Sequence, residues 1–234
     1  PNGIVLVTGP TGSGKTTTLY STLKQLATPE VNVCTIEDPI EMVEGTFNQM
    51  QVQHAIDLGF AEGVRALMRQ DPDIIMVGEI RDLETAEMAV QAALTGHLVL
   101  STLHTNDAPS TITRMIDMGI EAFNVASAVN LVVAQRLVRR VCKECAAPAT
   151  YKPEEIKSLG LTPEQGKKMP FRKGTGCDVC SGTGYKGRAG LYEVMAMSPE
   201  LRRMVLRGAS VADIQAMAVK EGMLTLRMDG LKKI

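Results

Sequence analysis

The 234-residue sequence contains no tryptophan, and aromatic residues make up only 3% of it. Proteins that bind single-stranded nucleic acid commonly stack bases on aromatic side chains, and few residues are available here for such a surface. Acidic and basic residues are balanced, with 25 Lys and Arg against 26 Asp and Glu and a net charge of −1. The strong basic excess that is typical of nucleic-acid-binding proteins is therefore absent from the chain as a whole.

Long apolar runs are also absent. No stretch reaches the roughly 18 consecutive apolar residues that a membrane-spanning helix needs, and no signal-peptide pattern is found. A hydrophobic content of 44% with 22% charged residues is typical of a folded globular protein. The sequence starts just before its first predicted strand and ends in a tail with lysines, so we expect it to be part of a longer protein.

The first residues contain a phosphate-binding loop. The apolar run Ile4–Val7 leads into GPTGSGKT at residues 9–16, which matches G-x-x-x-x-G-K-[ST] at every fixed position. Backbone N–H groups of such a loop surround the phosphates, Lys15 reaches the β- and γ-phosphates, and the Thr16 hydroxyl binds Mg²⁺. An amphipathic segment follows and places a helix N-terminus under the phosphates. We therefore expect nucleotide contacts from Gly9, Pro10, Thr11, Gly12, Ser13, Gly14, Lys15, Thr16 and Thr17.

Four short apolar runs are each followed directly by polar residues that suit nucleotide chemistry. The runs are Ile4–Thr8, Val33–Ile36, Ile74–Val77 and Leu98–Thr102. Runs this apolar, separated by helical segments, predict parallel strands that are buried on both faces. Because ligands bind at the carboxyl ends of parallel strands, the four polar segments are expected at one edge of the sheet. The predicted fold class is α/β with a largely parallel sheet.

Helical periodicity is clear between these runs. Apolar positions predict a helix over residues 60–69, a second one that Asp82 caps and that extends through Thr95, and a third one that Asn106 or Asp107 caps. A further helix, largely apolar and therefore buried, is predicted over Phe123–Leu137.

Carboxylates and histidines follow the predicted strands. Alone, the acidic residues after the second strand would indicate a solvated loop; beside a phosphate loop we favour water activation or Mg²⁺ binding. Because Gly78 ends the third strand where an Asp is usual, Glu79 is expected to do this work there. His97 and His104 flank the fourth strand, and His104 at its end can bond a phosphate oxygen. The acidic residues after the second strand are Glu37, Asp38, Glu41 and Glu44.

The sequence contains two C-x-x-C pairs separated by 31 residues, in a segment rich in Gly, Pro and Lys. Paired knuckles of this kind fit a structural Zn²⁺ held by four thiolates, which we favour over two disulfides. The four thiols are Cys142, Cys145, Cys177 and Cys180, while Cys34 is expected to be buried and free. The predicted division is an ATPase core over 1–140, a tetracysteine zinc module over 141–190 and a C-terminal helical segment over 191–234.

Together the motifs resemble the ATPases of type II secretion and type IV pilus assembly. The resemblance rests on the phosphate loop, TIEDPIE, RQDPDIIMVGEIRD, GHLVLSTLHTND, the two knuckles and GRAGLYE, and it covers essentially the whole chain. The segments NQMQVQ and AFNVASAVNLVVAQRL are most like the PilB-type pilus assembly branch.

The resemblance implies a RecA-like P-loop core and a homo-hexameric motor that uses ATP, Mg²⁺ and Zn²⁺ to extend a type IV pilus. The motor would be cytoplasmic and would attach to the inner membrane through a platform protein. It also implies that Glu41 is the general base, that Glu79 lies on the magnesium side, and that His97 and His104 lie near the γ-phosphate. The arginines implied to approach the nucleotide or the neighbouring subunit are Arg65, Arg69, Arg81 and Arg188.

Two alternatives remain open from the sequence. The first is a type II secretion ATPase, in which the same chemistry would serve another machine. The second is a RecA-like nucleic-acid motor, which the balanced charge and the scarcity of aromatics disfavour. No direct nucleic-acid partner is therefore expected.

Overall fold

The structure is a computed structural model, and it describes residues 2–234. The chain forms two compact units. Unit 1 contains the residues up to 135 together with 193–223, and unit 2 contains residues 136–192 and 224–234. The predicted C-terminal segment is divided between them, because α8 (Pro199–Leu206) and α9 (Val211–Lys220) belong to unit 1 and α10 (Leu226–Lys232) belongs to unit 2.

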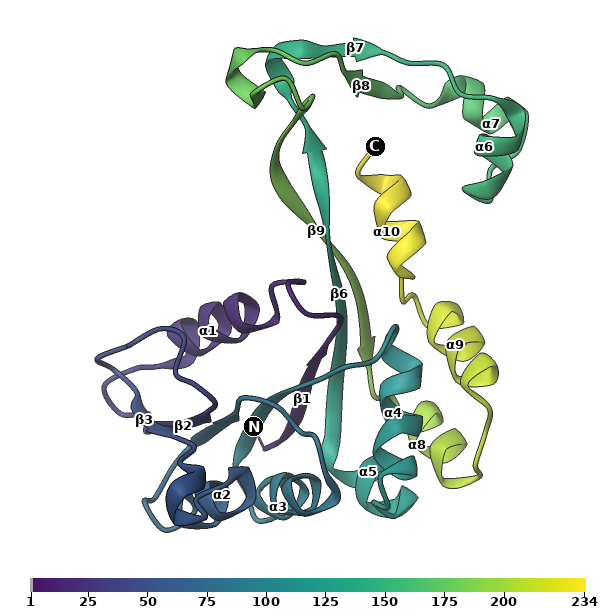
Figure 1. Ribbon diagram of the computed structural model, residues 1–234. Coiled ribbons are helices and arrows are strands. Elements are labelled where there is room, and N and C mark those ends of the chain that lie inside the picture. Colours follow the sequence, from purple (N-terminus) through teal and green to yellow (C-terminus); the bar gives the residue numbers. More distant parts are fainter. Residues whose placement is uncertain (1) are drawn as a thin grey trace. The chain divides into compact units, whose positions relative to one another are not determined.

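A seven-stranded sheet in the order β3-β2-β4-β5-β1-β6-β9 organises unit 1 (Figure 1). The pairs β1–β5, β1–β6, β2–β3, β2–β4 and β4–β5 are all parallel, which confirms the predicted α/β fold class. The strand bounds are β1 Gly3–Thr8, β2 Val33–Glu37, β3 Asn48–Gln51, β4 Ile74–Val77, β5 Leu98–Leu103, β6 Val129–Val141 and β9 Tyr185–Ala196.

Helices cover both faces of this sheet (Figure 1). Helix α1 (Lys15–Leu26) packs on one face, where Leu19, Tyr20 and Leu23 meet apolar side chains of β1, β2, β4 and β5. The other face is covered by α2 (Phe60–Leu67), α3 (Leu83–Leu94) and α5 (Ala122–Ala128). Side chains of one strand point alternately to the two faces, so strands covered on both sides are mostly apolar.

Two of the predicted helix starts are confirmed by their caps. The Asp82 carboxylate accepts a hydrogen bond from Thr85 N–H over 2.8 Å at the start of α3. Asp107, rather than Asn106, caps α4 (Ala108–Asp117) by accepting from Ser110 N–H over 2.8 Å. Each side chain pairs a backbone donor that the first helical turn leaves free.

The predicted helix over Phe123–Leu137 is wrong. Helix α5 ends at Ala128, and the chain continues as β6, which pairs with β1. The β-branched Val129, Val132 and Val133 suit a strand in the middle of a sheet. Because the run Leu131–Ala134 is apolar at every position, its sequence lacks the alternation that distinguishes a strand from a buried helix.

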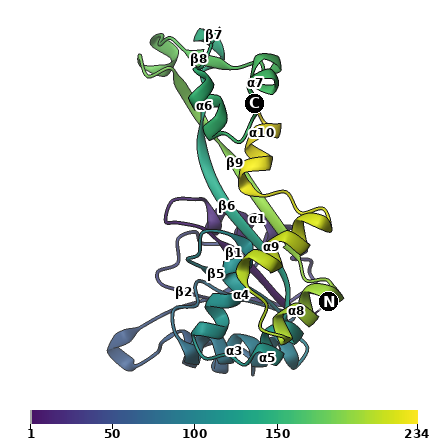
Figure 2. The same cartoon turned by 90° about the vertical axis from the view of Figure 1, so that its right-hand side faces the viewer.

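Unit 2 contains a small antiparallel pair of β7 (Ala146–Pro148) and β8 (Arg172–Gly174), with α6 (Pro153–Ser158) and α7 (Pro163–Lys168) between them (Figure 2). Tyr151 and Phe171 make an edge-to-face contact with ring centroids 5.3 Å apart. A side chain on Gly174 would collide with the Gly184 backbone, so the two glycines permit the close approach of these segments.

The two units carry opposite net charges. Unit 1 has 10 basic and 20 acidic residues, for a net charge of −10, and unit 2 has 15 basic and 6 acidic residues, for a net charge of +9. The balanced charge of the whole chain therefore describes neither unit. Among residues 2–234, no helix is both long enough and apolar enough to cross a membrane.

Candidate functional site

The phosphate loop lies between the end of β1 and the start of α1, as the sequence predicts. Gly12 and Gly14 have φ values of 75° and 86°, in the left-handed region that favours glycine, and α1 begins at the next residue, Lys15. The Lys15 ammonium lies over the loop and donates to the carbonyl oxygens of Gly9 and Pro10 over 2.9 and 3.1 Å. The N-terminus of α1 and the lysine side chain thus lie at the same loop, an arrangement suited to binding an anion.

A buried side chain of β6 supports this loop. The Gln135 amide donates to the Ser13 carbonyl oxygen over 2.7 Å and accepts from the Thr18 hydroxyl over 2.7 Å. Gln135 is 2% exposed. Sequence reasoning missed Gln135 because it lies in the segment that was predicted to be helical.

The surroundings of the Ser13 hydroxyl indicate whether the loop suits a phosphate. Ser13 is 3% exposed, and its Oγ atom has no hydrogen-bond partner among the described residues. A buried hydroxyl without a partner is costly, and phosphate oxygens are strong acceptors. The residues of the loop therefore fit a nucleotide phosphate.

Glu79, Arg81 and His104 meet at the carboxyl edge of the sheet. Glu79 follows β4 and pairs with Arg81, and its carboxylate lies 3.5 Å from Nε2 of His104, which follows β5. The Arg81 guanidinium, with a smaller effect from His104, holds the pKa of Glu79 below its usual value although burial opposes this shift. Glu79 is therefore an anion at neutral pH, and its carboxylate can bind a cation or accept a hydrogen bond from water.

His97 does not join this group. It precedes β5, where Leu98 pairs with Gly3, whereas the phosphate loop follows the opposite end of β1, where Thr8 pairs with Leu103. Its Nδ1 atom lies 2.9 Å from the Ala92 carbonyl oxygen at the end of α3. The expectation that His97 lies near the γ-phosphate is therefore corrected. Within one chain, the length of β5 separates His97 from the phosphate loop, and so from a nucleotide bound to that loop.

The acidic segment after β2 contains one buried carboxylate. Glu37 is the last residue of β2, is 3% exposed and accepts hydrogen bonds from the hydroxyls of Thr35 and Tyr20, each over 2.7 Å. Glu41 lies in the following loop and is exposed. Glu44 pairs with Lys24 at 2.5 Å, and Asp38 lies 3.7 Å from His54. Among the four acidic residues after β2, Glu41 is thus exposed and forms no ion pair with the residues that the structure describes.

Of the predicted arginines, Arg65 and Arg81 form ion pairs within the chain. Arg65 lies 3.9 Å from Glu62 and 3.4 Å from Glu84, and Arg69 donates to the Arg65 carbonyl oxygen over 3.4 Å. Arg188 lies in β9 within unit 2 and is exposed. Exposed ion pairs are weak, so Arg65 can exchange its carboxylate partners for others, and Arg69 is bound, within residues 2–234, only to a backbone carbonyl oxygen at 3.4 Å.

In unit 2 the sulfur atoms of Cys142, Cys145, Cys177 and Cys180 all lie within 4.8 Å of one another. The Cys142–Cys177 and Cys145–Cys180 Sγ atoms are 3.9 Å apart, and those of Cys177 and Cys180 are 3.7 Å apart. Four sulfurs at about 2.3 Å around a tetrahedral Zn²⁺ would lie about 3.8 Å from one another, whereas a disulfide needs about 2.0 Å. The cluster therefore fits a tetrahedral metal ion.

Backbone donors support the same interpretation. Burial opposes the Cys180 thiolate, but the N–H groups of Cys177 and Gly184, each 3.2 Å from its sulfur, help to lower the pKa of Cys180 to about 6. Thiolates are the form that binds metal. At Cys177 a backbone hydrogen bond with Cys180 lowers the pKa, but burial and the neighbouring thiols outweigh it and raise that pKa to about 11, so the backbone donors favour the thiolate at Cys180 alone. Cys34, by contrast, is buried in β2 and free, as predicted.

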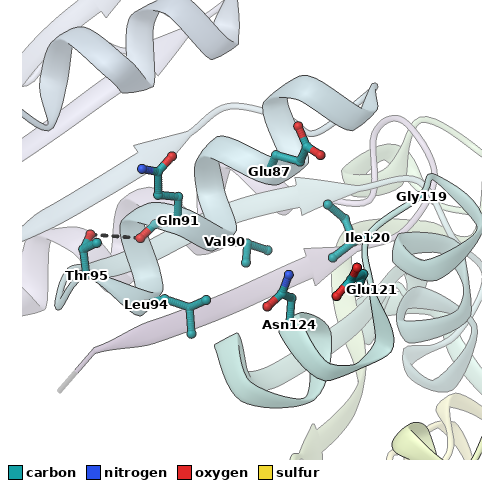
Figure 3. Close-up of a pocket in the computed structure, with 9 residues that line it drawn as sticks. All are labelled: Glu87, Val90, Gln91, Leu94, Thr95, Gly119, Ile120, Glu121 and Asn124. Carbon is teal, nitrogen blue, oxygen red and sulfur yellow. Dashed lines mark hydrogen bonds between the residues drawn. The ribbon is translucent and has the colours of Figure 1, made fainter.

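A separate hollow of about 370 Å³ lies between α3 and α5 (Figure 3). Val90, Leu94 and Ile120 line it together with the acidic Glu87 and Glu121. Since α3 leads into the amino end of β5, this hollow is remote from the phosphate-loop edge.

Comparisons with known proteins agree with this geometry. The family model described as "Type II/IV secretion system protein" matches residues 1–234. The type IV pilus assembly ATPase TfpB of Acinetobacter baylyi is 58% identical over all of this chain and 40% of its own length. The type II secretion system protein E of Xanthomonas campestris is 50% identical over all of this chain and 41% of its own length. The chain therefore spans about two fifths of these curated relatives.

Solved structures show the same fold. The ATPase DotB of Legionella pneumophila has a TM-score of 0.71 and 28% identity, over 99% of this chain and 56% of DotB. The pilus retraction motor PilT with bound ADP has a TM-score of 0.64 and 29% identity, over 97% of this chain and 60% of PilT.

Proposed function

The chain belongs to the type II/IV secretion system protein family, and from this premise we propose that it is the ATP-hydrolysing part of a motor that powers type IV pilus assembly. The observation that carries the proposal is the phosphate loop with the Glu79–Arg81–His104 group at the same sheet edge. Support for the pilus comes from relatives named as type IV pilus assembly ATPases, at 58% and 52% identity.

In the proposed reaction, the loop N–H groups and Lys15 bind the ATP phosphates, and Thr16 and Glu79 hold Mg²⁺ directly or through water. Bound Mg²⁺ would neutralise charge on the phosphate oxygens. Glu41 would orient water and accept its proton, and His104 would hydrogen-bond a phosphate oxygen. Glu79 is the competing general base, because it is already anionic and lies at the same edge.

The four cysteines would hold one structural Zn²⁺, since the cluster offers four thiols. The helices α6 and α7 and the β7–β8 pair of unit 2 are short, so the metal would contribute directly to the folding of this part of the chain. None of these cysteines lies at the sheet edge that carries the phosphate loop, so the metal would have a structural role.

The motor would be a homo-hexamer in the cytoplasm, and it would act at the inner membrane through a platform protein of the pilus machine. Arg65, Arg69, Arg81 and Arg188 would then approach the nucleotide or the neighbouring subunit. A type II secretion ATPase is the second candidate, because relatives of that name reach 50% identity.

The deciding experiment is a pulldown of the full-length protein with the purified platform protein of each machine. Binding to the pilus platform alone supports the proposal, and binding to the secretion platform alone replaces it with the second candidate. A parallel arm with single-stranded DNA at 50 and 200 mM salt tests for a nucleic-acid motor. DNA that stimulates ATP turnover would overturn the proposal.

A further inference from the structure

The loop that carries Glu41 is held by side-chain hydrogen bonds on both sides of that residue. Before it, Ile40 N–H donates to the Gln51 side chain over 3.2 Å. After it, the Met42 carbonyl oxygen lies 3.0 Å from the Tyr20 hydroxyl and accepts from the Gln49 amide over 2.9 Å. The same Gln49 side chain accepts from Glu44 N–H over 2.7 Å. The backbone around Glu41 is therefore fixed although its carboxylate is exposed.

The buried Glu37 carboxylate holds these side chains in place. Tyr20 O–H lies 2.8 and 2.7 Å from the two Glu37 oxygens, and Gln49 donates to Glu37 over 3.2 Å and to the Tyr20 oxygen over 2.9 Å. Tyr20 is 2% exposed, and burial followed by the Glu37 interactions raises its pKa, so its hydroxyl keeps its proton. The Glu37 oxygens accept from both side chains and so orient the two donors.

Tyr20 also links the loop to the nucleotide. It lies in α1, the helix that begins at Lys15 of the phosphate loop, and its ring packs beside Phe47 with centroids 5.9 Å apart. Figure 1 shows α1 beside the segment between β2 and β3. One helix thus carries the phosphate-binding lysine and a contact to the residue after Glu41.

We infer that Tyr20 and Gln49, organised by the buried Glu37, are positioning residues that set the place of Glu41 relative to the phosphate loop. The inference rests on the proposed function, in which Glu41 is the general base. A base must lie within hydrogen-bond reach of the water that it activates, and a displacement of about 1 Å costs up to about 100-fold in rate. The network therefore affects the rate of turnover through Glu41, while nucleotide binding depends on the phosphate loop.

The test uses four variants of the full-length protein: Tyr20→Phe, Glu41→Gln, their double variant, and Thr22→Val as the control. Tyr20→Phe keeps the ring and removes only the hydroxyl. Thr22→Val removes a hydroxyl from the same helix, and that hydroxyl donates to the Thr18 carbonyl oxygen over 2.9 Å. Steady-state kcat and KM, the Kd for ATP, and thermal unfolding are measured for each.

We expect Tyr20→Phe to lower kcat about 10- to 100-fold with KM and Kd for ATP within about twofold, and Thr22→Val to retain wild-type kinetics. Glu41→Gln should lower kcat by roughly 100-fold, and adding Tyr20→Phe should lower it no further, because both changes act through one carboxylate. Gln49→Leu should reproduce the kcat effect if Tyr20→Phe proves poorly folded.

Unchanged kcat in Tyr20→Phe and Gln49→Leu would overturn the inference while leaving the proposed function intact. An equal further loss of kcat in the double variant would also overturn it, because the two residues would then act independently. Full activity of Glu41→Gln would instead remove the proposed general base. Absence of ATP turnover in the wild-type protein would overturn the proposed function itself.

Discussion

The side-chain amide of Gln135 donates a hydrogen bond to the carbonyl oxygen of Ser13 over 2.7 Å, which joins strand β6 to the phosphate loop. The same side chain accepts from Thr18 in the first turns of α1. The phosphate loop and the start of α1 are thus both held by the buried side chain of Gln135.

Gln135→Leu should weaken ATP binding. The change leaves the Ser13 carbonyl and the Thr18 hydroxyl without this partner, at a cost of about 1–3 kcal/mol for each buried group that stays unsatisfied. We expect the Kd for ATP to rise about tenfold, as measured by titration calorimetry, with a lower midpoint of thermal unfolding. Wild-type affinity in a folded variant would show that the loop keeps its shape without Gln135.

Lys15→Ala should abolish ATP turnover, because Lys15 supplies the fixed positive charge of the phosphate loop. The measurement is phosphate release by the purified variant. The exposed Lys220 at the end of α9 offers a matched control, since Lys220→Ala should keep turnover. More than about a tenth of wild-type turnover in Lys15→Ala would contradict the site assignment.

The protein should contain one Zn²⁺ per chain, with Zn–S distances of about 2.3 Å in X-ray absorption. Cys177→Ser should lose the metal and expose unit 2 to proteolysis, because metal binding contributes to its folding. Cys34→Ala is the control, since this buried cysteine lies in β2 and should leave the zinc content unchanged. Metal analysis that finds no zinc would refute the prediction.

The Glu79–Arg81 pair should contribute to stability in a pH-dependent way. Because Arg81 lowers the pKa of Glu79 from its usual value of 4.5, the contribution is fully present above that pH and is lost as the pH falls through the lowered pKa. Urea unfolding should therefore show a larger difference between wild type and Arg81→Ala at pH 7 than at pH 3. Equal differences at the two pH values would exclude this linkage.

Arginines should act across a subunit boundary, because the phosphate loop has no arginine of its own to neutralise the γ-phosphoryl group, and an arginine finger of this kind contributes about 10³–10⁵-fold in the GTPase cases. Lys15→Ala subunits and Arg65→Ala/Arg69→Ala subunits should each be inactive alone. Mixed rings should recover ATPase activity, because some interfaces would pair an intact loop with intact arginines. If mixed rings form without activity, the arginines serve only local pairs such as Arg65–Glu84.

Local patterns in the sequence predicted the phosphate loop, the four apolar strands and the helix caps, because each depends on neighbouring residues. The spacing of the two C-x-x-C pairs likewise predicted the thiol cluster. Strand β6 was missed, since its continuous apolar run Leu131–Ala134 has no period that distinguishes a strand from a buried helix. Gln135 was missed with it.

Other features depend on contacts between segments far apart in the chain. Glu37 looked equivalent to Glu41 in the sequence, and only the meeting of Tyr20, Thr35 and Gln49 distinguishes the buried carboxylate from the exposed one. His97 and His104 both flank β5, but strand direction places them at opposite edges. The opposite charges of the two units appear only once the chain is divided as it folds.

The chain leaves unit 1 and returns to it inside strands, at Gln135–Arg136 in β6 and at Tyr192–Glu193 in β9. Neither of these two crossings offers a loop at which a protease or a cloning boundary could separate the units. Glu193, the first residue after the return, accepts from Ala108 N–H over 2.8 Å at the start of α4. A truncated chain that stops at residue 135 would therefore lose α8, α9 and this contact. To remove unit 2 cleanly, an engineer would have to join residue 135 to residue 193 with a designed turn and end the chain at residue 223.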